Sequence, residues 1–366
     1  MNQRIAAAAV LGAALATGCA VTRTAPDPEP FEPASSVEET FRWHRALSSL
    51  QTAWWDVVGE QQAWSFKNLQ QLFPSVPVYR AGPVSELPRR PLPEIGDYPV
   101  ETPSGTLRFA DFLNGKHSTT MGIAILHKGE IVFEAYPRME PYQKPIFWSV
   151  TKIFVSTVVA ILEDRGLVDV REPIEAYIPE LKESQLAGIP VRDILDMASG
   201  LDCSDDYENF DACYYRFETS LGDGFPTENS PDNPYDMLID FDYGYWAEPG
   251  TGFDYSGVNT FLLGWLVEEV TGMPFQDVLS REIWTRIGAE ADAAIFAGRY
   301  GVPLTPGGLT ANLRDVARFG LLFTPSTARV ADGRIVSERY LNLILHGGRP
   351  ELLDNARFGP PPQLDA

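Results

Sequence analysis

The sequence is poor in positive charge, and it holds few of the residues that build disulfide frameworks. It has 29 lysine and arginine residues against 50 aspartate and glutamate residues, a net charge of −21 over 366 residues. Nucleic-acid binding needs a basic face that neutralises phosphates, so this composition argues against nucleic acid as a partner. Three cysteines are too few for a disulfide-rich fold. The hydrophobic share of 44% is that of a globular chain with a sizeable core.

Several functional motifs are absent as well. No apolar run after the export-signal region approaches the ~20 residues of a membrane-spanning helix. There is no P-loop, no Gly-x-Gly-x-x-Gly, and no serine with glycines both two places before and two places after it. The four histidines are scattered, without a pair at metal-binding spacing, so we expect no metal site and no cofactor.

Residues 1–18 are predicted to be an export signal. Arg4 precedes an apolar stretch, and the segment LATGC, which ends at Cys19, is similar to a bacterial lipobox, where the cysteine is acylated. An ordinary signal peptide without a lipid is the alternative. Residues 19–36 are acidic and proline-rich and would form a tether. We therefore expect a bacterial cell-envelope protein, anchored to the membrane by a lipid on Cys19 and facing the periplasm or the exterior.

Cys203 and Cys213 are the two other cysteines, and they lie close together in an acidic loop, DCSDDYENFDAC. An exported chain meets an oxidising compartment, which favours a disulfide between them over two unpaired thiols. Metal binding by this pair is a weaker alternative, because no histidine lies nearby. We expect the disulfide to staple a local loop.

The rest of the chain alternates between strand and helix patterns. Residues 37–110 are assigned to an N-terminal helix, which starts after Ser36 with glutamates in its first turn, and an extended segment. Two strands that meet at Lys128-Gly129 predict a hairpin. Residues 111–366 are assigned to one domain with a mostly helical lobe at about 165–290. The further predicted helices cover residues 150–165, 191–201, 259–270, 275–287 and 313–322.

The segment FWSVTKI combines a hydroxyl with an amine. Ser149 would lie at a helix start with Lys152 one turn along the same face, so that the lysine nitrogen can reach the serine oxygen. Serine is a weak nucleophile unless a base takes its proton, and lysine serves as that base only where burial lowers its pKa from ~10.4. The helix that follows is apolar almost all round, which predicts burial. Its first backbone N–H groups, including that of Ser149, would be free to stabilise an oxyanion.

A structural role is the alternative for this pair, since a serine before a helix is commonly a cap. Two observations favour catalysis. Lysine is rare, with six residues against 23 arginines, and none follows Lys182. A lysine on an apolar, buried helix is also unfavourable unless it has a partner or a function.

The order of the motifs resembles the serine β-lactamase and penicillin-binding-protein-like superfamily, closest to class C-related esterases and 6-aminohexanoate-dimer hydrolases. The resemblance runs from about Leu69 to Val336. It implies an α+β or α/β fold, in which helices flank a β-lactamase-like antiparallel sheet and a second lobe is mostly helical. The matching segments, in order, are ILHKGEIVFEAY, FWSVTK, GLVDVREPIEAYIPEL with VRDILDMASGL, EPGTGFDYSGVNTFLLGWLVEEVTG and GGLTANLRDVARFGLL.

This resemblance assigns roles to three residues. Ser149 is the acylated nucleophile, Lys152 is its activating neighbour, and Tyr255 is a second proton carrier that delivers a proton to the leaving group. A phenol near an ammonium ionises more readily, so Lys152 and Tyr255 can share one proton. A turn-packing aromatic is the alternative for Tyr255.

Three more residues are candidate substrate contacts. Tyr207 is similar to a substrate-contacting tyrosine of the nylon-oligomer hydrolases, and Trp148 and Gly257 flank the predicted catalytic groups. The β-lactamase pattern has asparagine where this chain has Gly257. The resulting Tyr-Ser-Gly is similar to the esterases and amide hydrolases of the group.

One family element has no clear counterpart. The family carries Lys, His, Gln or a similar residue before glycine on a short strand that borders the acyl pocket and supplies the second oxyanion N–H. The candidate here, His346 in His346-Gly347-Gly348, follows a helical pattern, and we expect it to be a loop residue. No strand-rich run follows it, so we expect a chain truncated before the C-terminal strands of the fold. A family variant with a degenerate tail is the alternative.

The residues together predict a serine hydrolase that forms an acyl-enzyme with a small ester, amide or lactam and needs no cofactor. The alternative is a non-catalytic lipoprotein that keeps the scaffold as a binding or cell-envelope interaction module. The set of Ser149, Lys152 and Tyr255 favours the enzyme, and the missing third element favours the alternative.

Overall fold

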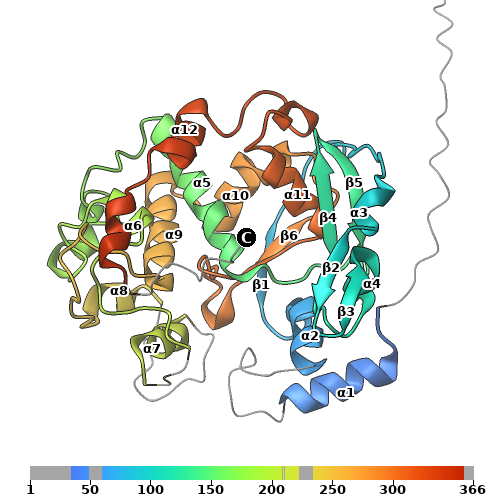
Figure 1. Ribbon diagram of the computed structural model, residues 1–366. Coiled ribbons are helices and arrows are strands. Elements are labelled where there is room, and N and C mark those ends of the chain that lie inside the picture. The colour runs from blue at the N-terminus through green and yellow to red at the C-terminus, as the bar shows by residue number, and fades with distance from the viewer. Residues whose placement is uncertain (1–33, 49–59, 208, 210, 222–233, 358–366) are drawn as a thin grey trace, which may run out of the picture.

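The computed structural model describes residues 34–48, 60–207, 209, 211–221 and 234–357 (Figure 1). The predicted export signal, Cys19 and nearly all of the predicted tether lie outside these residues. Within the described residues, no helix is long and apolar enough to cross a membrane.

The strands form three small antiparallel sheets, which makes the architecture α+β. One sheet has three strands in the order β1-β6-β7, and the other two are hairpins, β2-β3 and β4-β5. The strands are β1 (Ser75–Val78), β2 (Pro99–Thr102), β3 (Gly105–Arg108), β4 (Ile123–His127), β5 (Glu130–Ala135), β6 (Ala293–Phe296) and β7 (Leu309–Thr310).

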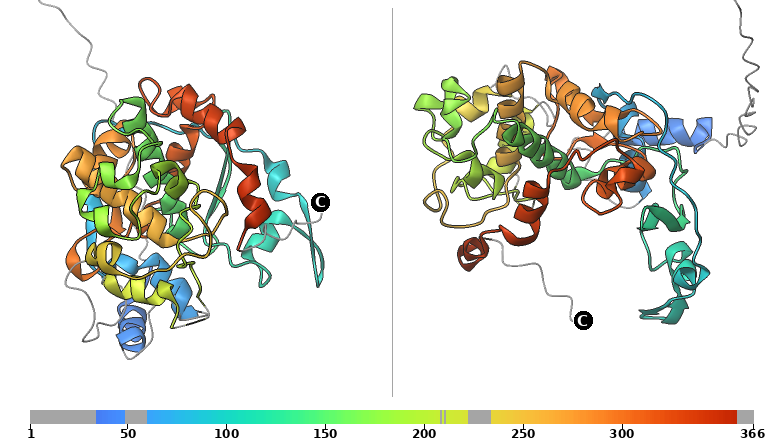
Figure 2. Two further views of the ribbon diagram at one scale, coloured as in Figure 1. Left: turned by 90° about the vertical axis from the view of Figure 1, so that its left-hand side faces the viewer. Right: turned by 90° about the horizontal axis from the view of Figure 1, so that it is seen from above.

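The predicted hairpin at Lys128-Gly129 is confirmed as β4-β5. Both turn residues are left-handed, with φ of 53° and 78°, as a two-residue hairpin turn requires. The outer edge of β5 is covered by an extended segment, because the Leu92 N–H donates to the Val132 carbonyl at 2.9 Å. Both hairpins lie on one side of the molecule, opposite the helical lobe (Figures 1 and 2).

The helices form most of the core. Helix α5 (Thr151–Asp164) packs against α9 (Gly257–Thr271) and α10 (Phe275–Glu282). Residues 257–267 of α9 are all buried, and the helix ends at Gly272 in the left-handed conformation, a common helix stop. The other helices are α1 (Val37–Ser48), α2 (Glu60–Lys67), α3 (Pro93–Gly96), α4 (Phe109–Asn114), α6 (Val191–Leu195), α7 (Cys213–Ser220), α8 (Asp236–Asp240), α11 (Leu313–Leu321) and α12 (Glu338–His346).

Most predicted helices are confirmed, with corrected ends. The first begins as predicted, since the Ser36 hydroxyl accepts the Glu39 N–H at 3.0 Å. Helix α6 ends at Leu195 rather than at 201, because Met197 and Gly200 adopt left-handed conformations that turn the chain. Helix α10 ends at Glu282, and a 3₁₀ turn continues it.

The region after α11 (Leu313–Leu321) differs from the expectation for His346. This residue is the last of α12 rather than part of a loop, because the apolar, helix-forming run before it continues through it. The chain then forms a 3₁₀ segment at Pro350–Asn355. In the described part of the chain, β7 (Leu309–Thr310) is the last strand.

Candidate active site

Ser149 lies in a 3₁₀ turn, Trp148–Val150, that leads directly into α5. The residue before this turn is held by β7, since the Phe147 N–H donates to the Leu309 carbonyl at 2.8 Å. Trp148 has a φ of 45°, an uncommon conformation for a bulky residue. The turn leaves the Ser149 side chain exposed, while the helix behind it is buried among apolar residues.

Lys152 lies one helical turn beyond Ser149, as the spacing predicts. Its Nζ donates to the Ser149 Oγ at 3.2 Å and to the Pro306 carbonyl at 2.8 Å. The same nitrogen lies 4.8 Å from the centroid of the Tyr255 ring. Lys152 is half-buried. Its amine therefore contacts the candidate nucleophile and the face of the candidate second proton carrier at once.

The Pro306 carbonyl is a site group that sequence reasoning missed. It lies in a tight turn, where the Gly307 and Gly308 N–H groups both donate to the Leu304 carbonyl. A Cβ at Gly308 would come within 2.9 Å of that carbonyl, so the turn requires glycine there. The Gly-Gly pair in the sequence signals a turn but gives no sign that its neighbour accepts a bond from Lys152.

Tyr255 lies in the segment just before α9. Ser256 precedes the helix, and its hydroxyl donates to the Cys203 carbonyl at 2.5 Å. The Tyr255 carbonyl accepts the Asp205 N–H at 3.1 Å. The three residues predicted as catalytic, Ser149, Lys152 and Tyr255, thus come together from the start of α5 and the segment just before α9, about a hundred residues apart in sequence.

Asp205 completes this arrangement, although the sequence analysis did not select it. Its Oδ1 accepts the Gly257 N–H at 2.7 Å, at the first turn of α9, and its Oδ2 accepts the Tyr207 hydroxyl at 3.4 Å. Burial raises the pKa of the Asp205 carboxyl, and the charge of Lys152 and the Gly257 N–H oppose this rise. A carboxylate close in sequence to a helix N-terminus can be recognised as a cap. Asp205 lies 52 residues before Gly257, so the sequence does not indicate that it caps α9.

The candidate substrate contacts have different surroundings. The Tyr207 side chain is exposed, and the pKa of its phenol is raised by partial burial and by the charge of Asp205. Trp148 packs edge-on against Phe66 of α2, with ring centroids 5.3 Å apart. Gly257 is buried and its N–H is taken by Asp205. A Cβ at Gly257 would lie 3.3 Å from the Asp205 Oδ1, so glycine allows this close approach.

The loop that carries Asp205 and Tyr207 is closed by a disulfide. Cys203 and Cys213 are bonded, with their Cα atoms 5.1 Å apart. The bridge spans ten residues of sequence and encloses both Asp205 and Tyr207. It thereby limits the conformations of the segment that contacts Tyr255 and Gly257.

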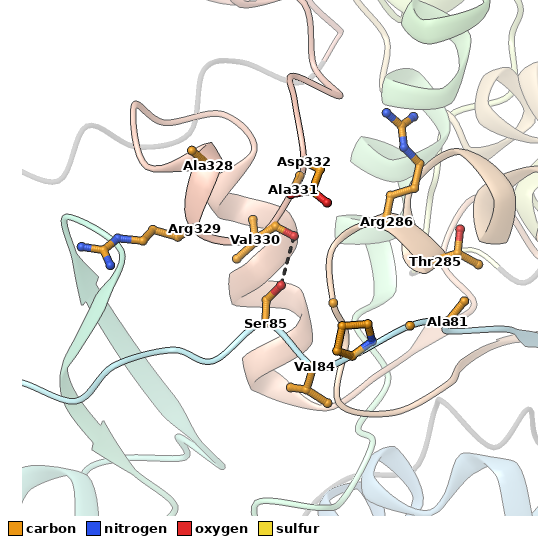
Figure 3. Close-up of a pocket in the computed structure, with 13 residues that line it drawn as sticks. Ala81, Val84, Ser85, Thr285, Arg286, Ala328, Arg329, Val330, Ala331 and Asp332 are labelled. Atoms are coloured by element: carbon orange, nitrogen blue, oxygen red, sulfur yellow. Dashed lines mark hydrogen bonds between the residues drawn. The ribbon is translucent and has the colours of Figure 1, made fainter. Parts of the chain in front are cut away.

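A separate cavity of about 410 Å³ lies away from these residues (Figure 3). It is formed by the segments 81–85 and 328–332, and the Ser85 hydroxyl donates to the Val330 carbonyl at 3.3 Å across it. None of the predicted site residues lines it. Across the described residues, no group of three or more His, Cys, Asp or Glu side chains is arranged to hold a metal ion.

Comparison with known families matches most of the chain. A family model described as Beta-lactamase matches residues 108–359. The matched region contains Ser149, Lys152, Asp205 and Tyr255.

Two individual proteins are similar over most of their length. A 6-aminohexanoate-dimer hydrolase of Paenarthrobacter ureafaciens is 29% identical over 297 residues, which covers 81% of this chain and 72% of that protein. A solved structure of a candidate 6-aminohexanoate-dimer hydrolase from Bacillus anthracis has a TM-score of 0.66 and 20% identity, and covers 77% of this chain and 74% of that one. The structural similarity, at this identity, supports the fold alone.

Proposed function

The chain belongs to the beta-lactamase family, and from this premise we propose that it is a serine hydrolase that forms an acyl-enzyme at Ser149. The family membership agrees with the resemblance expected from the motifs. The contact of the Lys152 Nζ with the Ser149 Oγ, at 3.2 Å and above the Tyr255 ring, is the observation that carries the proposal.

Acylation begins with attack of the Ser149 Oγ on a substrate carbonyl. The serine proton passes to Lys152, whose Nζ contacts the Ser149 Oγ and lies over the Tyr255 ring. In the proposed reaction the amine and the phenol of Tyr255 then share that proton. A bond forms between the Oγ and the carbonyl carbon, and the carbonyl oxygen takes the negative charge. The Ser149 N–H, at the start of a helix, lies where orphan backbone donors occur and supplies one donor to that oxygen.

Collapse of this intermediate breaks the bond to the leaving amine or alcohol. Tyr255 delivers the proton to that leaving group, and the acyl group stays on Ser149. A water molecule then attacks the ester, loses its proton to the same pair, and releases a carboxylic acid with the serine hydroxyl restored. Division into two steps lowers the barrier that a single hydrolysis would have to cross.

The substrate is proposed to be a small amide or ester. The hydrolase relative named for the 6-aminohexanoate dimer supports an amide among these. Gly257 supports the same choice over a lactam, because it stands where the β-lactamase pattern has asparagine and its N–H is engaged by Asp205.

A non-catalytic binding or interaction module is the second candidate. It is favoured by one observation: in the described residues no strand follows β7, and His346 ends a helix instead of opening a strand. The second backbone donor that the family resemblance implies therefore has no counterpart in this part of the structure.

A fluorophosphonate probe separates the two candidates. The enzyme is expected to be labelled at Ser149, and Ser149→Ala is expected to lose the label. Ser156→Ala is the matched control, because Ser156 lies further along α5 and its hydroxyl donates to the Ile153 carbonyl. Absence of labelling, or equal labelling of Ser149→Ala, would contradict the enzyme. Comparison of a short-chain nitrophenyl ester, an aminohexanoyl anilide and a chromogenic cephalosporin then sorts esterase, amidase and lactamase activity.

The location in the bacterial cell envelope is a further proposal, supported by the lipobox-like segment that ends at Cys19. Cells fed radiolabelled palmitate are expected to label the protein, and Cys19→Ala is expected to abolish the label. Secretion of an unlabelled, shortened wild-type chain would favour the ordinary signal peptide instead.

A further inference from the structure

Two separate segments carry the candidate site residues beside α9. One begins at Asp202 and contains Asp205 and Tyr207, and the other runs through Asp254 to Tyr255. They are joined by the backbone bond from the Asp205 N–H to the Tyr255 carbonyl, and just beyond Tyr255 by the bonds of Ser256 and Gly257 to the first segment. A device that holds both segments would therefore control the alignment of the site.

Arg357 contacts both segments. Its Nη1 lies 2.5 Å from the Asp202 Oδ1 and 3.5 Å from the Asp254 Oδ2. Its guanidinium also lies 5.7 Å from the centroid of the Trp246 ring. One side chain therefore bridges the residue just before the disulfide-closed loop and the residue just before Tyr255.

The backbone around Arg357 is docked on the same segment. The Arg357 N–H donates to the Phe253 carbonyl at 3.0 Å, and the Phe253 N–H reaches the carbonyls of Leu352 and Asn355 at 3.2 and 3.1 Å. The Asn355 side chain donates to the Thr251 carbonyl at 3.2 Å. These bonds place Arg357 accurately over its two carboxylates.

Gly252 permits this docking. A Cβ there would come within 2.6 Å of both the Asn355 carbonyl oxygen and the Trp246 ring. Only glycine allows the strap of residues 352–357 to approach the chain so closely. The contact is thus built into the EPGTGFDYSG segment that ends in the candidate catalytic tyrosine.

Asp254 stands in an energetically unfavourable place. Its side chain is 4% exposed, and neither carboxylate oxygen has a hydrogen-bond partner among the described residues. A buried carboxylate without full hydrogen bonding lowers stability. Among the described residues its attractive partner is the Arg357 guanidinium, so the pair has a structural cost that a function would explain.

We propose that Arg357 is a positioning residue, whose guanidinium clamps Asp202 and Asp254 and so fixes the Asp205 segment and the Tyr255 segment relative to each other. The clamp rests on the proposed function for its effect on hydrolysis. Its effect on the two segments can be measured without any reaction.

The clamp is expected to depend on pH through Asp254. Burial, followed by the charges of Asp202 and Asp205, raises the pKa of this carboxyl, Arg357 opposes the rise, and the resulting pKa is about 6. The segment at Met197 also contacts Asp254, but through an uncharged group: the Met197 carbonyl accepts the Asp254 N–H at 2.9 Å. A pKa raised above the ordinary 3.8 means that the docked Tyr255 segment binds this proton more tightly than a released segment would. A fall in pH through 6 is therefore expected to keep the segment docked, whereas above pH 6 the ionised, buried Asp254 depends on the Arg357 charge.

The test compares full-length Arg357→Gln, Arg357→Lys and the double variant Arg357→Gln/Asp254→Asn with the wild type. Arg171→Gln is the matched control, since Arg171 forms an exposed ion pair with Asp169 elsewhere. Arg357→Gln is expected to lower kcat for a nitrophenyl ester by about tenfold with KM nearly unchanged, because misplacement of catalytic groups affects the chemical step. Arg357→Lys is expected to recover part of this loss.

The loss of kcat in Arg357→Gln is expected to be largest above pH 6, where Asp254 is ionised. Asp254→Asn is neutral at every pH, so the double variant is expected to recover part of that loss. Hydrogen exchange is measured on the same proteins. Compared with wild type at the same pH, exchange of the Asp205 and Phe253 amides is expected to quicken in Arg357→Gln, more at pH 8 than at pH 5, and to stay unchanged in Arg171→Gln.

Two failures are distinguishable. Amides that exchange equally in Arg357→Gln and wild type, or an effect of Arg357→Gln that is the same at pH 5 and pH 8, would overturn the clamp whatever the chemistry. A wild-type chain that no fluorophosphonate labels would overturn the hydrolase, while faster exchange in Arg357→Gln would still support the clamp as a device that aligns the two segments.

Discussion

The two sides of the candidate site are held by different forces. Lys152 lies on α5 and Ser149 in the 3₁₀ turn that leads into it, so that burial of the apolar side chains of α5 fixes both. Tyr255 and Asp205 are held by a disulfide, ion pairs and hydrogen bonds between segments far apart in sequence. The amine side is therefore expected to tolerate changes of pH and redox state, whereas the phenol side is expected to respond to both.

The largest effect is expected where the two sides meet. Lys152→Gln removes the amine that contacts the Ser149 Oγ and lies over the Tyr255 ring, and it is expected to lower kcat about 10³-fold, within the range for loss of a general base. Hydrolysis of a nitrophenyl ester measures this. Lys182→Gln, at an exposed lysine, is the control and is expected to keep full activity. A kcat of Lys152→Gln within threefold of the wild-type value would contradict the proposed role of Lys152 as the base.

The packing that supports the amine side can be broken at Phe154. This fully buried ring stacks on Phe319, with centroids 3.8 Å apart. Phe154→Ala is expected to lower the free energy of unfolding by about 3–5 kcal/mol, through lost burial and a cavity. Urea denaturation measures it. Ile153→Ala, one residue away and 47% exposed, is expected to cost less than about 1 kcal/mol. Equal losses would mean that α5 is not held by its buried face.

The phenol side is expected to depend on the disulfide. The Cys203–Cys213 bridge joins residues ten positions apart, and its loss is expected to lower the free energy of unfolding by about 2–3 kcal/mol. Reductant is also expected to lower hydrolysis, since Asp205 and Tyr207 lie inside the loop. Thermal unfolding and activity with and without dithiothreitol measure both effects. The Cys203→Ala/Cys213→Ala variant should no longer respond to reductant, and a response that persists would argue for another target.

Asp254 is expected to lower stability at neutral pH. Its folded pKa of about 6 lies above the ordinary 3.8, so the folded state binds the proton more tightly. Its contribution to the free energy of unfolding is therefore greatest below pH 3.8 and declines as the pH rises towards 6. Asp254→Asn resembles the protonated form and is expected to be about 1–2 kcal/mol more stable than wild type at pH 7, with no gain near pH 4. Urea titrations at both pH values measure this, and a gain at pH 4 alone would contradict it.

The smallest expected effect separates the charge of Asp205 from its hydrogen bond. Asp205→Asn keeps an oxygen for the Gly257 N–H but removes the charge that acts on Lys152, and it is expected to lower kcat about tenfold with little change in stability. Asp205→Ala also leaves the start of α9 uncapped and is expected to lose about 1 kcal/mol of stability in addition. Equal kcat values for wild type and Asp205→Asn would show that the charge has no part in the reaction.

The same division explains what could be predicted from the sequence. Ser149 and Lys152 are one helical turn apart, so periodicity alone places them together, and the long apolar helices α5 and α9 are strong patterns. The end of α6 could not be predicted in this way. Met197 adopts a left-handed conformation that ends the helix early, and methionine is not a residue type that favours this conformation. Two-residue and four-residue strands such as β7 and β1 are equally weak signals, because tertiary pairing forms them.

The residues that sequence reasoning missed act across long separations. Asp205 meets Gly257, the Pro306 carbonyl meets Lys152, and Arg357 meets Asp202. An ion pair or backbone contact between positions 52 to 155 residues apart leaves no periodic trace in either segment. Tyr255 was recognised because the order of motifs resembles a family, and the forces that hold it became visible only with the fold.

If the chain is exported as proposed, the Cys203–Cys213 bridge would form only after it reaches an oxidising compartment. Under the proposed hydrolase function, the loop that bears Asp205 would then be constrained outside the cytosol alone, and a newly made chain would have little activity towards metabolites at the site of synthesis.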